Sequence, residues 1–410
     1  MHLVALNIPD LLLGLWRGTI DCEKTDSKRT WNWAVLKGKV WKTHGSDIAA
    51  MTEYLPGSFD QPLRNPAEKI SSGYKAWEYL MYMFGIGPAA FYRLLPKKYW
   101  INFCKLVYRI QLLQQHNISK DNLRTAHLLL IEFTEEFEDL YYQHCADRLH
   151  FCCQSIHVLA HIAPETVRVG PAICYSQWTM ERAIGDLGAE IRQPSNPYMN
   201  LSECAVRRAQ VNTLKTLIPE LDSTKGSISR GGVDLGNSPG GHVLLPPVDN
   251  CSRVLTEHEP EAINKYLISK GIQCARTAWK ETKQEKLRTS RNIKYKTSNK
   301  QVKFAEVQYF FILRINGETR HFVAMVLPYL SPDAALLEKS HGALKSYRPG
   351  NQVEDLEVID IKSIESVVAI IPHPNQTIME ELKGRFFVVE KPGLELADLG
   401  GLIAQEDNDE

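Results

Sequence analysis

The first half of the chain places its apolar residues at helical spacing. Between residues 97 and 114 they recur every three or four positions, which predicts a helix with one buried face. Ser119 is placed to cap a second helix, and Asp147 to begin a third. Pro164 and Gly170-Pro171 are expected to follow that third helix. We therefore predict that residues 1–220 form a largely helical domain.

In the second half the apolar period shortens towards two. The runs 307–313 and 321–326 flank Asn316-Gly317, a dipeptide typical of a tight β-hairpin. A helix is expected before them, near residues 257–270. Further short apolar runs predict additional strands at 358–361, 367–371 and 386–389.

These two halves are joined by a segment of different composition. Residues 221–248 are rich in Gly, Ser and Pro, which is typical of a flexible linker. Residues 249–395 are expected to form a small antiparallel, barrel-like β-rich domain, and residues 396–410 an acidic tail. The predicted fold class is thus α+β.

The composition and net charge limit the expected location of the protein and the kind of partner it binds. The 410 residues carry 48 Lys+Arg and 48 Asp+Glu, so a nucleic-acid footprint must be local. Nine cysteines without regular spacing favour a reducing compartment, so a nuclear or cytoplasmic location is expected rather than secretion. No apolar run is long enough to predict a membrane span.

The third predicted helix carries candidate metal ligands. His150, Cys153, His157 and His161 are spaced three, four and four residues apart, which would place them on one helical face. Imidazole and thiolate are the ligands that Zn²⁺ accepts. The other interpretation is a helix whose histidines hydrogen-bond to its neighbours.

Glu181 is the candidate catalytic carboxylate. It stands near an expected helix start, where the helix dipole favours an acid without any catalytic role. A site for two metal ions needs further acids converging on it. Asp186 and Glu190 lie along the same expected helix, so they do not form a pocket with Glu181.

Two basic segments are candidate DNA contacts. The smaller one contains Arg207 and Arg208. The larger spans residues 276–303, where cations interleave with Trp279 and Tyr295, a composition suited to phosphate contact and base stacking. A solvated loop or a lysine-guarded edge strand fits the same composition. The candidate contacts in this segment are Lys280, Lys283, Lys286, Arg288, Arg291, Lys294 and Lys296.

The sequence lacks the motifs of several enzyme classes. There is no serine nucleophile elbow, nucleotide-binding loop or kinase signature. Cys152 and Cys153 lie in a run too apolar to predict a reactive thiolate. No small-molecule cofactor is expected.

Taken together, these motifs resemble the C-terminal portion of fungal Tnp2-type transposases of CACTA-like (En/Spm) DNA elements. The likeness extends over nearly the whole chain. It is carried by Met1-His2-Leu3-Val4-Ala5-Leu6-Asn7, Leu15-Trp16-Arg17-Gly18, Tyr54-Leu55-Pro56-Gly57-Ser58-Phe59-Asp60, Gly73-Tyr74-Lys75-Ala76-Trp77-Glu78, Leu95-Pro96-Lys97-Lys98-Tyr99-Trp100, the His157/His161 pair, Gly170-Pro171 and Trp178-Thr179-Met180-Glu181-Arg182.

This resemblance implies a site as well as a fold. Such transposases are expected to use an RNase H-like core in which two aspartates and a late glutamate hold Mg²⁺ or Mn²⁺, and Glu181 matches that glutamate. The order of His157, His161 and Glu181 is similar to the zinc-supported site of the V(D)J recombinase catalytic subunit, which implies half of a Zn²⁺ site. The implied partners are the DNA of transposon ends or full-length transposase subunits.

The chain also departs from the family pattern. An aspartate expected just before Met1-His2 is absent, as are the earlier aspartate and a Cys-X-X-Cys. We therefore expect a transposase-derived protein that is inactive alone. The alternative is a repurposed DNA-binding or protein-interaction module that uses residues 276–303. A third interpretation is an active nuclease that recruits Asp60 or Glu78.

Overall fold

The protein divides into two compact units. One comprises Tyr175–Val248 together with Met1, and the other His2–Cys174 together with Asp249–Glu410. This grouping differs from the predicted division, because the β-rich residues share a unit with the N-terminal helices. The structure, a computed structural model, describes residues 1–59, 61–191, 195–221, 233–234, 243–244, 255, 258–270, 291–315, 319–350, 355–374 and 379–397.

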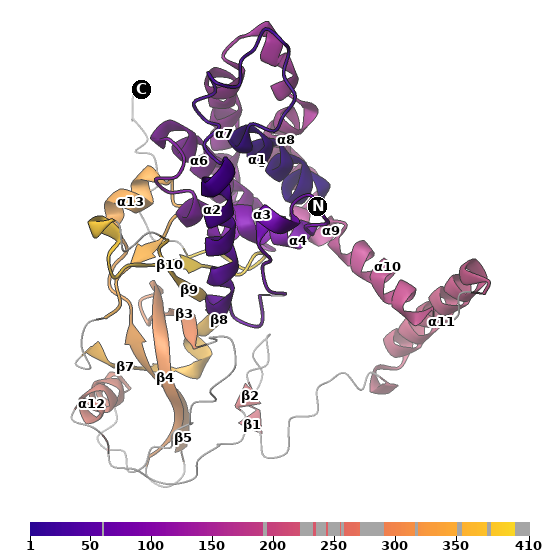
Figure 1. Cartoon of the computed structure of the whole chain (residues 1–410). Coiled ribbons are helices and arrows are strands. Elements are labelled where there is room, and N and C mark those ends of the chain that lie inside the picture. The colour runs from indigo at the N-terminus through magenta and orange to yellow at the C-terminus, as the bar shows by residue number, and fades with distance from the viewer. Residues whose placement is uncertain are drawn as a thin grey trace, which may run out of the picture. The chain divides into compact units, whose positions relative to one another are not determined.

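The larger unit is built first from helices. The longer ones, α6, α7 and α8, pack in chain order, α6 against α7 and α7 against α8 (Figure 1). The helices of residues 1–175 are α1 (Ile8–Arg17), α2 (Gly38–Ala50), α3 (Pro66–Lys69), α4 (Ala76–Tyr79), α5 (Gly87–Ala90), α6 (Lys97–Leu113), α7 (Lys120–Phe137), α8 (Gln154–Val169) and α9 (Ala172–Tyr175).

Two of the helix predictions are confirmed. Helix α6 lies within the predicted 97–114, and most of its residues are buried. Helix α7 begins directly after Ser119, whose Oγ accepts a hydrogen bond from the backbone N–H of Asn122 at 3.1 Å. This cap satisfies one of the N–H groups that a helix start leaves without a partner.

The predicted start of the third helix is wrong, as is the break at Pro164, whereas the break at Gly170 is confirmed. Residues Ala146–Phe151 form a 3-10 turn, and α8 begins only at Gln154. Asp147 does not cap a helix, because its carboxylate accepts a hydrogen bond from the Thr25 hydroxyl at 2.6 Å. At the other end, α8 continues through Pro164 and stops at Gly170, whose φ of 89° requires the left-handed region that glycine tolerates.

Antiparallel pairing organises the second part of this unit. Strands β4 and β5 form the hairpin predicted around Asn316-Gly317, and those two turn residues lie outside the described residues. A five-stranded sheet has the order β7-β5-β4-β3-β8, and a three-stranded sheet the order β6-β10-β9. The strands are β3 (Asn292–Lys296), β4 (Val302–Ile315), β5 (Thr319–Pro328), β6 (Ser346–Tyr347), β7 (Glu357–Asp360), β8 (Ile364–Val367), β9 (Ala369–Pro372) and β10 (Phe386–Val389).

Two further helices accompany the sheets. Helix α12 (Glu259–Ser269) confirms the helix expected near 257–270, and it shares a hydrophobic cluster with Phe311 and Val323 of the β4–β5 hairpin. Helix α13 (Ala334–Lys339) begins at Asp333, whose side chain accepts from the N–H of Leu336. The fold is thus α+β with antiparallel sheets in the C-terminal part, as predicted.

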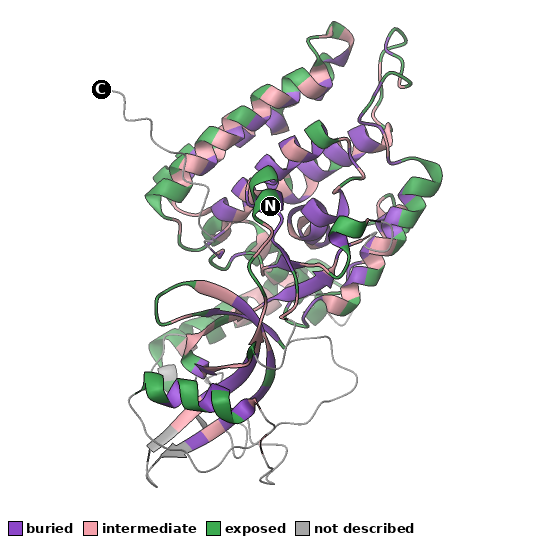
Figure 2. Cartoon of the chain, turned by 90° about the vertical axis from the view of Figure 1, so that its left-hand side faces the viewer, coloured by how far each residue is buried: buried purple, intermediate pink, exposed green. Residues whose placement is uncertain are grey.

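Helices and strands of the larger unit share one core. The same hydrophobic cluster holds Trp16 and Phe103 from the helices and Ile371 and Phe387 from the three-stranded sheet. A single buried residue, Val368, separates β8 in one sheet from β9 in the other. Figure 2 shows buried residues on the inner helices and along the strands, whereas the outer helices are largely exposed. The β-rich residues therefore complete the helical core.

The smaller unit has a different character. It contains α10 (Trp178–Glu190), α11 (Pro197–Leu217) and a short antiparallel pair, β1 (Val233–Asp234) with β2 (Val243–Leu244). Neither α10 nor α11 has a buried residue. Large apolar side chains on both helices are exposed. Among the residues described, no helix of either unit is long and apolar enough to cross a lipid bilayer.

Candidate metal-ligand pair and nucleic-acid interface

His157 and His161 face each other on the outer side of α8. Their Nε2 atoms lie 3.0 Å apart, and both side chains are exposed. The opposite side of α8 buries Ile156, Leu159 and Ala163 in the core, which fixes the helix and therefore the histidine pair. Zn²⁺ binds imidazole nitrogen at about 2.0–2.1 Å in tetrahedral geometry, so the pair fits two corners of such a site.

The other two predicted members of this face lie elsewhere. His150 lies in the 3-10 turn, where its Nε2 is 2.8 Å from the carbonyl oxygen of Asp21. Cys153 stands at the N-terminal boundary of α8, outside the helix. Within the described residues, no three His, Cys, Asp or Glu side chains gather as a metal site. Of the four residues predicted to share this face, His157 and His161 are the two that lie together on α8.

Glu181 lies in the first turn of α10 and is exposed. It belongs to the smaller unit, whereas the histidine pair belongs to the larger one. The acids further along α10 are engaged with Arg208 of α11: its Nη1 is 3.5 Å from Asp186, and its Nη2 pairs with Glu190. These acids join two helices and do not converge on Glu181.

Several other predicted residues are already paired. Arg207 lies 3.7 Å from Glu203 on the same helix. The buried Glu78 carboxylate accepts from the Arg64 guanidinium at 2.8 Å and from the N–H of Lys75 at 2.7 Å, so it has a structural role. Asp60 lies outside the described residues.

The structure describes only the last part of the larger basic segment, from Arg291 onward. Lys280, Lys283, Lys286 and Arg288 lie outside the described residues. Arg291 is exposed and forms a 2.7 Å ion pair with Glu306. The alternative prediction, an edge strand, is wrong for β3. This strand pairs with β4 on one side and with β8 on the other.

Lys294 and Lys296 have opposite surroundings although both belong to β3. Lys294 is buried, lies 3.7 Å from Glu365, and donates to the carbonyl oxygen of Glu395. A phosphate could reach it only by displacing these partners, so the buried position of Lys294 argues against its predicted role. Lys296 is exposed and pairs with the same Glu365.

A groove opens beside the turn that follows β3. Its rim carries Lys296, Lys300 and Lys303, which together define what we call the lysine groove, of about 730 Å³. Residues 329–332 and the pair Glu395 and Leu396 form other parts of its wall. Lys296 pairs with Glu365 and Lys303 lies 3.0 Å from Glu357, so among the described residues Lys300 is the lysine of this groove without an ion pair.

The turn that carries Lys300 has a defined backbone conformation. The N–H of Thr297 donates to the carbonyl oxygen of Gln301 at 2.9 Å, and Lys300 has a left-handed φ of 62°. Lys300 is exposed at this tip, and within the described residues it forms no ion pair. Below it, the buried Tyr347 hydroxyl has no hydrogen-bond partner among the described groups, and burial raises its pKa.

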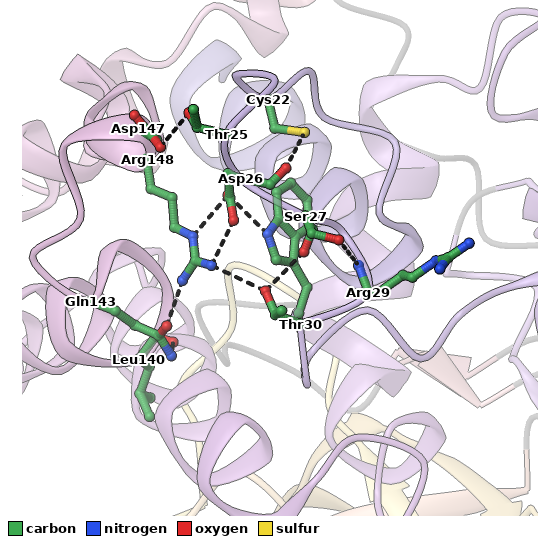
Figure 3. Close-up of polar contacts among 11 residues, drawn as sticks. Cys22, Thr25, Asp26, Ser27, Arg29, Thr30, Leu140, Gln143, Asp147 and Arg148 are labelled. Atoms are coloured by element: carbon green, nitrogen blue, oxygen red, sulfur yellow. Dashed lines mark hydrogen bonds and ion pairs between the residues drawn. The ribbon is translucent and has the colours of Figure 1, made fainter.

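One polar network near α8 has no counterpart in the sequence analysis. Asp26, from the loop between α1 and α2, receives Arg148 of the 3-10 turn and the Trp31 indole N–H at 3.0 Å (Figure 3). Arg148 also donates to Gln143 and lies over the Trp33 ring at 5.4 Å. Trp31 and Trp33 in this loop were the available signal, because large aromatic side chains are normally buried.

The chain matches no protein-family model, no curated protein and no solved structure.

Proposed function

We propose that the chain is a transposase-derived protein that binds nucleic acid through the basic residues 276–303, three of which line the lysine groove. The observation that carries the proposal is the rim of Lys296, Lys300 and Lys303, with Lys300 exposed and without an ion pair at the tip of the turn. Phosphates attract such groups because contact releases condensed counterions. The descent is proposed from the sequence motifs, as is an RNase H-like origin of the helical part.

The proposal assigns binding to this chain and does not assign strand cleavage to the chain on its own. Two-metal phosphoryl transfer requires carboxylates that converge on one point. Asp186 and Glu190 instead pair with Arg208, while Glu181 stands on the exposed first turn. Transposon ends are the proposed DNA partner, and transposase subunits the alternative partner. Specific nicking of terminal-repeat DNA with Mg²⁺ or Mn²⁺, lost in Glu181→Gln, would contradict the noncatalytic assignment.

The binding test compares two cations of equal charge. We expect the full chain to bind DNA with an affinity that falls as salt rises, and Lys300→Glu to weaken it at low salt. Lys42→Glu, an exposed position on α2, is the matched control. Fluorescence anisotropy with labelled duplex and single-stranded DNA gives the affinity.

A second variant tests the part of the segment outside the described residues. Replacing Lys280, Lys283, Lys286 and Arg288 together by Gln removes four cations, and each lost phosphate contact lowers the salt slope by roughly 0.7–0.9. Absence of binding by the wild type at low ionic strength would overturn the proposal. Equal affinities of wild type, Lys300→Glu and the quadruple variant would do the same.

A further inference from the structure

Helix α2 forms one wall of a second cavity, remote in sequence from the basic segment. The cavity has a volume of about 290 Å³ and lies between α2, α5 and Pro374, which follows β9. Its deeper lining is apolar: Ile48, Met51 and Ala90 are buried. A cavity of this size is at the lower end of the range for ligand sites, which suits a small ligand.

The polar group at the bottom of the cavity carries no charge. His44 is buried, and its Nε2 lies 2.8 Å from the Tyr82 hydroxyl. Burial lowers the pKa of His44 to about 3, so its imidazole is neutral at physiological pH. His44 therefore adds no positive charge to the lining, which is apolar at Ile48, Met51 and Ala90.

Asp47 supplies the single acid of the lining, one helical turn beyond His44. It is half-buried, and among the described residues it has neither an ion pair nor a side-chain hydrogen bond. Burial raises its pKa, which is the expected response of a carboxylate with too little solvent and no cation. A carboxylate at an apolar cavity thus lacks the cation that would compensate it.

Lys39, the one lysine of the lining, does not fill this role. It is exposed and lies eight residues before Asp47, about 12 Å along the helix axis. No ion pair joins the two side chains. The Asp47 carboxylate and the apolar wall beside it are therefore available to a ligand that has both a positive charge and an apolar part.

We propose that this cavity binds a small alkylammonium ion. The ammonium group pairs with the Asp47 carboxylate, and the alkyl chain lies against Ile48, Met51 and Ala90. This site is separate from the lysine groove and does not rest on nucleic-acid binding. The assignment follows from charge complementarity at Asp47 and from the neutrality of His44.

The experiment titrates the full chain with butylammonium chloride in a calorimeter. Saturable binding is expected for this probe, and much weaker binding for ammonium chloride, which lacks the chain, and for butanol, which lacks the charge. Asp47→Asn keeps the side-chain shape and is expected to weaken binding at least about tenfold, ~1.4 kcal/mol. Glu53→Gln, an exposed acid in the turn after α2, is the matched control and is expected to bind like wild type.

A second variant guards against misfolding of the first. Thr43 is exposed at the cavity, so Thr43→Trp obstructs the entrance without touching the core. It is expected to abolish binding while the thermal unfolding midpoint stays unchanged. Absence of saturable butylammonium binding by the wild type overturns the proposal, as does equal binding by Asp47→Asn or by butanol.

Discussion

Arg148 holds Asp26 through two parallel hydrogen bonds that join positions 122 residues apart. Nε lies 2.8 Å from Oδ2 and Nη2 lies 2.7 Å from Oδ1, and both side chains are nearly buried. The hydrogen bonds from Arg148 are the main reason that the pKa of Asp26 lies below its usual value. The pair fastens the loop between α1 and α2 to the segment that precedes α8.

Breaking this pair from either side is expected to destabilise the protein. Asp26→Asn leaves the buried Arg148 guanidinium without its counter-ion, and Arg148→Met leaves the buried Asp26 carboxylate without one. Each substitution is expected to lower the free energy of unfolding by about 3–5 kcal/mol. Urea unfolding near neutral pH measures the loss. Glu23→Gln, an exposed acid in the same loop, is the control and is expected to change little. Equal stability of Asp26→Asn and the control would refute the role given to the pair.

The pH dependence of this loss has a definite sign. Because the pKa of Asp26 is lower in the fold than in the unfolded chain, its contribution is complete above the unfolded value, about 3.9. It disappears as the pH falls through the folded value. The stability difference between wild type and Asp26→Asn should therefore shrink in acid, and a difference that grew in acid would contradict this assignment.

His44 predicts a second pH effect, at higher pH. Its folded pKa of about 3 lies below the unfolded value of about 6.5, so below that value the unfolded state takes up a proton that the fold excludes. As the pH is lowered through this range, the free energy of unfolding therefore decreases by up to about 1.4 kcal/mol per pH unit. His44→Phe removes this contribution, while the buried His373, with a pKa of about 4, keeps its own. Unfolding free energies between about pH 4 and 7 should show a smaller slope in the variant, and identical slopes would contradict the prediction.

The histidine pair on α8 predicts weak binding of one Zn²⁺ per chain. Two imidazoles already 3.0 Å apart need little rearrangement to share an ion, and water completes its coordination. His157→Ala and His161→Ala should each weaken Zn²⁺ at least about tenfold, ~1.4 kcal/mol. His144→Ala, an exposed histidine outside α8, is the control. Equilibrium dialysis measures the affinity, and equal affinities of all three variants would refute the site.

The two units should differ in local stability. Helices α10 and α11 bury no residue, whereas α6 buries most of its length. Local opening is cheap where few apolar contacts are lost. Hydrogen exchange followed by mass spectrometry should therefore label α10 and α11 well before α6. Simultaneous exchange of α6 and α11 would show that the smaller unit is stabilised by contacts other than its own core.

Local patterns were enough to predict some elements. Helix α6, the Ser119 cap and the β4–β5 hairpin depend on spacing or on adjacent residues, which the sequence displays directly. The start of α8 could not be predicted in this way. Asp147 resembles a helix cap, but Thr25 binds its carboxylate, and that contact spans more than a hundred residues.

The candidate sites depend even more on tertiary placement. Lys294 looks like an exposed cation in sequence, yet its side chain is buried and donates to the carbonyl oxygen of Glu395, about a hundred residues further along the chain. The alkylammonium cavity requires α2, α5 and Pro374 together, and no short motif announces it. The His157/His161 pair was accessible because both ligands lie on one helix at a spacing of four.

The shared core has a consequence for how the chain is made. Phe387 and Val389 of β10 belong to the same cluster as Leu12 and Trp16 of α1. During synthesis the helices leave the ribosome long before the strand that completes their core. Contacts of such long sequence separation slow folding and leave apolar surface exposed meanwhile. The core of the N-terminal helices should thus stay incomplete until β10 has left the ribosome.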